Sequence, residues 1–321
     1  MKLANKIFHK INGLNYIQEF LCLSKGDMQN PLHVYLVTPQ KKILKEISFE
    51  HLIIGYSIAA FWDYGTYNPN AYTHMSFANE SYLPGEIINN KKELATLLLK
   101  KIHQFIIDDL HISYYEAVKG EHKFTNSFHQ LIFDLHNVLF NKKKGNIYLT
   151  NRVYKTVQVV YSLPRKVCLI TVGSDEKYNI FPTDLHGMIN GYYIISLRIG
   201  GKACSQVEEN KKILISDIHS SNYIKVYSLG KNHMKELVAK ENFDFIDGHS
   251  ELYNLPLPKG LIEYKELELL SSFAHGIHKF MFFKITNTKK IADNKHALAH
   301  IHKCYATWRD KNGIKSEYLL R

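Results

Sequence analysis

The sequence predicts an α+β protein whose C-terminal half is a β-barrel. Apolar residues recur at helical spacing over residues 94–106 and 124–139. From residue 146 onward the pattern changes to short apolar runs of strand length, separated by turns that contain glycine. These runs cover residues 167–172, 192–197 and 279–285. Many short strands with few helices are typical of a barrel.

The N-terminal half is expected to combine strands, an irregular segment and two helices. Residues 34–37 and 52–56 read as strands, and residues 64–84 as a long irregular segment because Tyr, Asn, Gly and Pro are frequent there. The first helix, over residues 94–106, would bury a leucine-rich face. The second, over residues 124–139, has Thr125 or Asn126 as a candidate cap.

A basic segment at residues 141–145 is the predicted boundary between two domains. Three lysines precede Gly145 there, which is typical of a helix end followed by a turn. We therefore expect residues 1–145 to form an α+β module of unknown role and residues 146–321 to form the barrel domain. Within the second part, residues 147–149 and 157–161 read as further strands, and residues 204–213 and 231–240 as helices.

Composition restricts the class of protein. The chain has 321 residues, is 45% hydrophobic and carries a net charge of +11. Lysines interrupt the N-terminus, and no apolar run reaches the length of a membrane span, so we expect a cytoplasmic protein without a membrane partner. The four cysteines form no CxxC pair and are expected to be reduced, buried thiols. The positive charge suits nucleic acid or a phosphorylated cofactor, but the lysines are spread out, so nucleic acid is not the expected partner.

The segment from residue 163 to residue 216 is the candidate binding site. An apolar run ends at Arg198, and Gly200, Gly201 and Lys202 follow directly before a segment with helix-forming composition. A helix start offers backbone N–H groups to an anion, glycines allow close approach, and Arg or Lys adds charge-assisted hydrogen bonds. Ser205 is expected to cap this helix and to offer its hydroxyl to a phosphate. An ordinary strand–turn–helix corner with surface cations is the alternative.

A polar segment precedes this turn and is expected to form a loop beside it. It contains Asn179, Pro182, Thr183, Asp184 and Leu185, and the proline would stiffen it. A polar loop that merely ends a strand is the competing interpretation, because Asn, Asp and Thr are common in turns.

The order of these residues resembles that of the flavin reductase-like family, over roughly residues 160–290. The resemblance lies in the pair Pro164-Arg165, then Asn179, Thr183, Arg198, Lys202 and Ser205, and finally a glycine turn that carries His278. It implies an FMN-binding split β-barrel of the Greek-key type. Asp184 departs from the pattern, because many members have a small hydroxyl or amide residue there, and a carboxylate would repel the phosphate.

The resemblance also implies a chemistry. FMN, with FAD as the alternative, would be held by Asn179, Pro182, Thr183, Asp184, Leu185, Arg198, Gly200, Lys202 and Ser205. NAD(P)H would be the reductant, and His278 would lie near the nicotinamide as the catalytic residue. Family members build the site at or near a two-fold interface, so a homodimer is expected. A small-molecule electron acceptor or a partner oxygenase would take the electrons.

Two other functions remain open. The first is a non-enzymatic flavin-binding protein whose N-terminal module binds a partner, and the second is a basic nucleic-acid-binding protein with a degenerate barrel. His296, His300 and Cys304 would share one face if they lay on a helix, but an ordinary helix surface or dimer contact is expected there, and no metal site is predicted.

Overall fold

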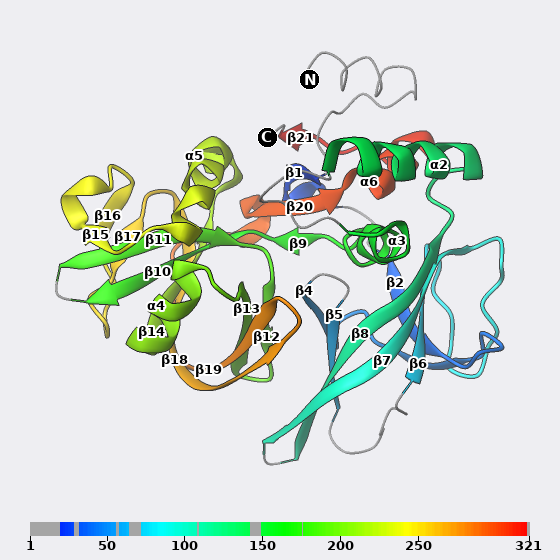
Figure 1. Ribbon diagram of the computed structural model, residues 1–321, viewed down its shortest axis with the longest axis horizontal. Helices are drawn as coiled ribbons and strands as arrows, with labels where there is room; N and C mark the ends of the chain where they lie inside the picture. The colour runs from blue at the N-terminus through cyan, green and yellow to red at the C-terminus, as the bar shows by residue number, and fades with distance from the viewer. Residues whose placement is uncertain are drawn as a thin grey trace. The chain divides into compact units, whose positions relative to one another are not determined.

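The computed structural model contains both helices and strands, as the sequence predicts (Figure 1). It describes residues 20–28, 32–55, 58–63, 72–107, 109–141, 149–174 and 176–319. The chain divides into two compact units, the first made of residues 1–21, 29–163 and 301–315, the second of residues 22–28, 164–300 and 316–321. The division passes between Leu163 and Pro164, whereas the sequence predicts a boundary at residues 141–145, mostly outside the described residues.

The first unit contains a seven-stranded antiparallel sheet in the order β3-β2-β6-β7-β8-β5-β4. Its strands are β2 (His33–Val37), β3 (Ile43–Glu46), β4 (His51–Gly55), β5 (Ile58–Asp63), β6 (Tyr72–Ala78), β7 (Glu93–Ile107) and β8 (Leu110–His122). The predicted strands at residues 34–37 and 52–55 are confirmed, while residue 56 lies outside the described residues. The irregular segment predicted over residues 64–84 is wrong where β6 runs, and residues 64–71 are not described.

The predicted helix over residues 94–106 is wrong, because this segment is the long strand β7. Its pairing with β8 shifts register between Leu98 and Leu99 and again between Lys101 and His103. The extra residue at the first shift is Val118 of β8, and at the second it is Ile102 of β7, which moves the later apolar positions of β7 out of strict alternation. The resulting spacing of three and four residues imitates a helix.

Helices of the first unit follow β8. The predicted second helix is confirmed as α2 (Ser127–His136), which a π-helical turn, η2 (Asn137–Asn141), extends. Asn126 caps α2, because its side chain accepts a hydrogen bond from the backbone N–H of His129 at 2.9 Å. The strand predicted at residues 157–161 is instead the end of α3 (Asn151–Val160), and of residues 147–149 only the last is described. Another helix, α6 (Lys303–Lys311), completes this set.

An eight-stranded antiparallel sheet forms the second unit, in the order β12-β13-β19-β18-β14-β10-β11-β15. Its strands are β10 (Cys168–Ser174), β11 (Lys177–Thr183), β12 (His186–Ile189), β13 (Tyr192–Arg198), β14 (Lys212–Ile218), β15 (Val238–Ala239), β18 (Leu261–His275) and β19 (His278–Lys290). The strands predicted at residues 167–172, 192–197 and 279–285 are therefore confirmed in position, with ends shifted by a few residues.

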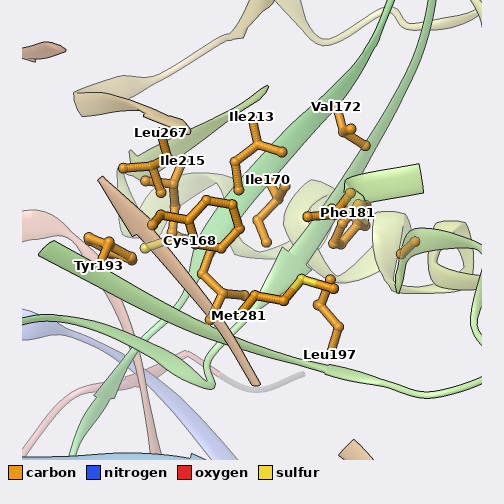
Figure 2. Packing of buried hydrophobic residues seen from close by; sticks show 14 of the residues in the cluster. Cys168, Ile170, Val172, Phe181, Tyr193, Leu197, Ile213, Ile215, Leu267 and Met281 are labelled. Atoms are coloured by element: carbon orange, nitrogen blue, oxygen red, sulfur yellow. The ribbon is translucent and has the colours of Figure 1, made fainter. Parts of the chain in front are cut away.

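This sheet is rolled around one core. Residues from strands far apart in the sheet order, such as Ile170 on β10, Ile195 on β13 and Met281 on β19, belong to one buried cluster. Figure 2 shows Ile170, Ile215 and Met281 from three strands pointing into the same space. The helix α4 (Lys202–Asn210) adds Ala203, Cys204 and Val207 to the cluster.

The opposite face of β10 and β11 packs against a second cluster that includes Leu169, Ile180 and Val226. Val226 comes from α5 (Tyr223–Ser228), which the 3-10 segment η4 (Leu229–Met234) follows. The helix predicted over residues 204–213 is confirmed as α4, two residues earlier at its start. The helix predicted over residues 231–240 is wrong, because the chain leaves η4 at Met234 and enters β15.

Two smaller sheets complete the structure. One has the order β21-β1-β20-β9, made of β21 (Tyr318–Leu319), β1 (Phe20–Ser24), β20 (Leu298–His302) and β9 (Arg165–Lys166), and the other pairs β16 (Ile246–His249) with β17 (Pro256–Pro258). The helix surface expected for His296, His300 and Cys304 is wrong, because these residues lie in a 3-10 turn, in β20 and in α6. All four cysteines are buried and free. Within the described residues, no helix has the length and apolarity needed to cross a membrane.

Candidate functional site

The predicted anion cradle is the turn that joins β13 to α4. Arg198 ends β13, Gly201 is the residue before the helix, and Lys202 is its first residue. Gly200 has φ +82°, a conformation that side chains other than glycine rarely adopt. A Cβ on Gly201 would lie 3.3 Å from the carbonyl oxygens of Arg198 and His233, so this glycine permits a close approach. The N–H of Cys204 bonds to the carbonyl oxygen of Gly201 at 3.1 Å, whereas the N–H groups of Lys202 and Ala203 precede the helical hydrogen bonds of α4.

The two cations of the cradle differ in their surroundings. Lys202 is ion-paired with Glu236 at 2.5 Å, and this contact raises the pKa of Lys202. Arg198 is exposed and pairs with His278 across the β13–β19 ladder. An incoming anion would therefore meet Arg198 directly but would share Lys202 with Glu236.

Ser205 does not cap the helix, contrary to the sequence prediction. It lies in the first turn of α4, where its hydroxyl donates to the carbonyl oxygen of Lys202 at 3.0 Å. The residue at the cap position is Gly201, which has no side chain to make a cap bond. Ser205 is nevertheless exposed on the same turn as Lys202.

His278 lies beside the cradle at the start of β19. A two-residue turn of Gly276 and Ile277 joins β18 to β19, as the glycine-turn pattern predicts, and Ile277 accepts a hydrogen bond from the backbone N–H of Ile199 at 2.9 Å. The His278 side chain is 5% exposed, and its Nδ1 is 3.0 Å from Oγ of Ser196. Burial, and then the charge of Arg198, lower the pKa of His278 to about 4. The imidazole is therefore neutral at neutral pH.

The expected polar loop is largely a strand, because β11 continues to Thr183. Asn179 is 1% exposed, and its Nδ2 donates to Oε1 of Gln206 at 2.8 Å and to the carbonyl oxygen of Asn232 at 2.9 Å. This side chain therefore fastens β11 to α4 and η4. The carbonyl oxygen of Pro182 accepts from Nε2 of His233 at 2.7 Å, which fixes η4 against the same strand.

The turn after β11 meets β13 at Ser196. The hydroxyl of Thr183 accepts from the backbone N–H of Leu185 at 3.3 Å, and the carbonyl oxygen of Leu185 accepts from the N–H of Ser196 at 2.9 Å. Because Ser196 also contacts His278, both segments singled out in the sequence converge on this one residue. Asn179 is the exception, since its amide group is directed into the packing between β11 and α4.

Asp184 is held by a cation that the sequence analysis did not assign to it. Its carboxylate is 2.8 Å from Nη1 of Arg165 and 2.9 Å from Nδ1 of His300. Burial would raise the pKa of Asp184, but Arg165 and the hydrogen bond from His300 hold it well below its usual value. The charge of Asp184 is thereby compensated within the protein. Pro164-Arg165 was noted only as the start of a strand, so the pairing was missed.

A second buried polar cluster lies where β9, β10, β12 and β14 meet, and sequence reasoning missed it as well. Lys166 is ion-paired with Asp217, which also accepts from the thiol of Cys168 at 3.0 Å. The ring of His186 reaches the carbonyl oxygen of Lys166 at 3.0 Å and the hydroxyl of Tyr193 at 2.7 Å. Burial and then Asp217 raise the pKa of Cys168 well above its usual value, so this thiol is protonated and unsuited to nucleophilic attack. The cluster links β12, an edge strand of the eight-stranded sheet, to β9 of the sheet β21-β1-β20-β9.

Solved structures of flavin reductases and FMN-binding proteins are similar to part of this chain. An NADH:FAD oxidoreductase of Streptomyces globisporus is 12% identical, with 50% of this chain and 95% of that one covered and a TM-score of 0.42. The flavin reductase PheA2 is 12% identical, with 54% and 100% covered and a TM-score of 0.39. A flavoredoxin of Methanosarcina acetivorans is 16% identical, with 42% and 79% covered and a TM-score of 0.36. No protein-family model and no curated protein sequence matches the chain.

Proposed function

We propose that this protein is a flavoprotein that binds FMN at the turn between β13 and α4 and reduces it with NAD(P)H. The observation that supports this function is the convergence at Ser196: the cradle strand, the turn after β11 and the His278 hairpin are all tied to this residue. FAD is the alternative cofactor. We further propose that the rolled sheet of the second unit is a split β-barrel of the Greek-key type.

The residues present fit a flavin phosphate. Gly200 and Gly201 leave the backbone bare at the start of α4, Arg198 is exposed, and Lys202 lies on the first turn of the helix. Backbone N–H groups at a helix start together with one or two cations suit a phosphate dianion. Asp184, which a flavin would otherwise disfavour, is neutralised by Arg165 and His300. Thr183 and Leu185 follow on the same side of the turn and would meet the polar parts of the cofactor.

Bound flavin would supply the ring that accepts a hydride from the nicotinamide. The protein's own part is then to bind and orient both molecules, which by itself lowers a barrier substantially. His278 is neutral and fixed by Ser196, so we assign it the role of orienting the nicotinamide and shielding it from water. No proton transfer by this side chain is needed. Electrons would leave to a small-molecule acceptor or a partner oxygenase.

A flavin-binding protein without turnover is the second candidate, because His278 is only 5% exposed and offers little surface to a nicotinamide. We propose a homodimer, as sequence resemblance implies, and a cytoplasmic location, which four reduced cysteines suit.

Flavin titration of the purified chain tests the proposal. We expect FMN to bind, with its fluorescence and absorbance changed, and Arg198→Ala and Lys202→Ala to weaken binding by about tenfold each. Lys289→Ala is the matched control, because Lys289 is also ion-paired with an exposed glutamate, Glu251, at 2.5 Å on β19. Unchanged affinity in both cradle variants would refute the phosphate assignment.

Anaerobic mixing of the FMN-loaded protein with NADH or NADPH separates the two candidates. Bleaching of the flavin absorbance supports the reductase, and the faster of the two reductants identifies the preferred one. Stable binding of FMN without bleaching supports the non-enzymatic flavoprotein.

A further inference from the structure

A pocket in the first unit lies on one face of its seven-stranded sheet. Its volume is about 250 Å³, which leaves room for a small ligand only. Strands β2, β6, β7 and β8 and the turn after β2 supply its wall. The polar side chains that line it are Thr38, Lys41, His74, Ser76, Glu93, Thr96, Glu121, His122 and Lys123.

Ladder register explains why so many polar groups meet there. Ser76 on β6 lies opposite Thr96 on β7, and Thr96 lies opposite Glu121 on β8. His74, two residues before Ser76, points to the same side because side chains alternate along a strand. A row of polar side chains therefore crosses three adjacent strands on the face opposite to that of the buried residues Met75, Phe77 and Leu97.

Glu93 is the centre of this site. Its side chain is 2% exposed, and its carboxylate accepts from the hydroxyl of Ser76 at 2.9 Å. Lys41 is ion-paired with the same carboxylate, and Nζ of Lys123 is 3.9 Å from it. Burying a charge is costly unless it is paired, so the buried carboxylate of Glu93 requires these partners.

The cations at the pocket exceed what Glu93 needs. Two lining lysines, Lys41 and Lys123, share the single charge of Glu93. The second lining carboxylate, Glu121, is paired at 2.8 Å with Lys119, which does not line the pocket. Lys41 also donates to Oδ1 of Asn90 at 2.6 Å, and Lys123 donates to the carbonyl oxygen of Asn90 at 2.5 Å. An ammonium group has three N–H donors. Among the described residues, these contacts leave at least one donor on each lysine for a ligand.

We infer that this pocket binds a small molecule through an oxyanion, either a carboxylate or a phosphate, held between Lys41 and Lys123. Hydroxyls of Thr38 and Thr96 would contact the polar body of the ligand. An amine ligand fits less well, because it would compete with Lys41 for a carboxylate that is already saturated. The site is independent of the proposed flavin site, since all its residues belong to the first unit.

Calorimetric titration of the full chain with malonate and with inorganic phosphate tests the inference. Both titrations are repeated in the Arg198→Ala, Lys202→Ala double variant, which removes the cradle as a competing phosphate site. We expect binding to persist in this variant, and the tighter of the two probes identifies the source of the oxyanion. Failure of both probes to bind at millimolar concentration, or loss of binding in the cradle variant, would overturn the inference.

Substitutions in the pocket sharpen the test. Lys123→Gln should weaken binding by about tenfold, while Lys92→Gln, which removes a lysine paired with Glu80 outside the pocket, should leave it unchanged. Glu93→Gln frees both lysines and should tighten binding of the anion severalfold. If this variant does not fold, Lys123→Gln alone decides. Binding of ethylamine by the wild type, lost in Glu93→Gln, would replace the inference with a cation site.

Discussion

Oγ of Ser196 lies 3.0 Å from Nδ1 of His278, and this pair joins the centre of β13 to the first residue of β19. The contact fixes the orientation of an imidazole that is almost fully buried. Because the N–H of Ser196 also bonds to Leu185, the position of the ring depends on the turn after β11. His278 is therefore held by the same residue that aligns the edge of the proposed flavin site.

Replacement of His278 should reduce turnover more than cofactor binding. We expect His278→Ala to lower kcat for NAD(P)H oxidation about tenfold, because an orienting contact is lost, with the FMN dissociation constant changed less than twofold. Ser196→Ala should also lower kcat, but by less, because the imidazole then loses its hydrogen bond to Ser196 but stays in place. Stopped-flow reduction of the FMN-loaded protein measures both.

The expected pH dependence distinguishes orientation from proton transfer. Since the pKa of His278 is lowered to about 4, its charge does not change near neutrality, and flavin reduction should be flat from about pH 6 to pH 8. A rate that follows a single ionisation in this range and disappears in His278→Ala would make His278 an acid–base catalyst instead.

The sequence identified the elements around the site better than those of the first unit. Residues 192–197 form a short apolar run of strand length that ends in a charged turn with two glycines, so the strand, the turn and the helix could all be predicted. In β7, by contrast, the extra residue Ile102 interrupts the alternation, so the strand resembles a helix in sequence. The end of α3 was misread as a strand because Val157, Val159 and Val160 are β-branched, although all three are buried in a helix. Tertiary packing decides both cases.

Pairings between distant residues were not foreseeable. Asp184 and His300 are 116 residues apart, and only the pairing of β20 with β9 brings His300 beside Arg165. The spacing of His300 from Cys304 had instead suggested a helix face. The family resemblance assigns Asn179 to the flavin, but its position inside β11 directs its side chain to Gln206.

Loss of the Asp184 carboxylate should destabilise the second unit. Asp184→Asn leaves Arg165, whose side chain is 5% exposed, without its counter-charge, which typically costs about 3–5 kcal/mol. Asp184→Asn with Arg165→Met should recover part of this loss, because no buried charge then remains. Urea unfolding of the wild type, of these two variants and of the single variant Arg165→Met gives the coupling free energy. Additive losses in the double variant would show that the pair does not interact.

The cradle should require glycine at position 200 because of the positive φ of this residue, and not because a side chain would clash there. Gly200→Ala forces a Cβ onto a residue with φ +82° and should cost about 1–2 kcal/mol of stability, although no atom lies within 4 Å of that Cβ. FMN affinity should fall with it, because the turn must shift to relieve the strain. Gly230→Ala is the matched control, since that Cβ also meets nothing within 4 Å and its φ is not positive. Equal unfolding free energies for both variants would contradict the strain argument.

Gly120 should be required for a different reason, which is the close approach of α3 to β8. A Cβ at this position would lie 2.9 Å from Cα of Thr156 and 3.1 Å from Cδ2 of Leu97, so Gly120→Ala must displace the helix. Overpacking of this kind costs about 1–3 kcal/mol, and thermal unfolding should show it. Lys119→Ala, at the neighbouring residue of β8, should change stability by less than about 0.5 kcal/mol because its side chain is exposed.

The free energy of unfolding should decrease as the pH is lowered through the range in which the buried histidines titrate. The pKa values of His122, His186 and His278 are each lowered to about 4, chiefly by burial. In the unfolded chain the same groups titrate near pH 6.5, so between about pH 6.5 and pH 4 the unfolded state binds more protons. Their contribution is complete above pH 6.5 and is lost as the pH falls, with a slope of up to about 1.4 kcal/mol per pH unit for each histidine.

Removing one of these histidines should therefore flatten the pH dependence. His278→Gln keeps a polar side chain but cannot take up the proton, so its unfolding free energy should decline less steeply than that of the wild type below pH 6.5. His249→Gln is the control, because this imidazole is already exposed to solvent in the folded protein. Guanidinium unfolding at a series of pH values measures all three slopes. If the slopes of His278→Gln and the wild type are equal, His278 takes up protons equally in both states, and burial does not lower its pKa.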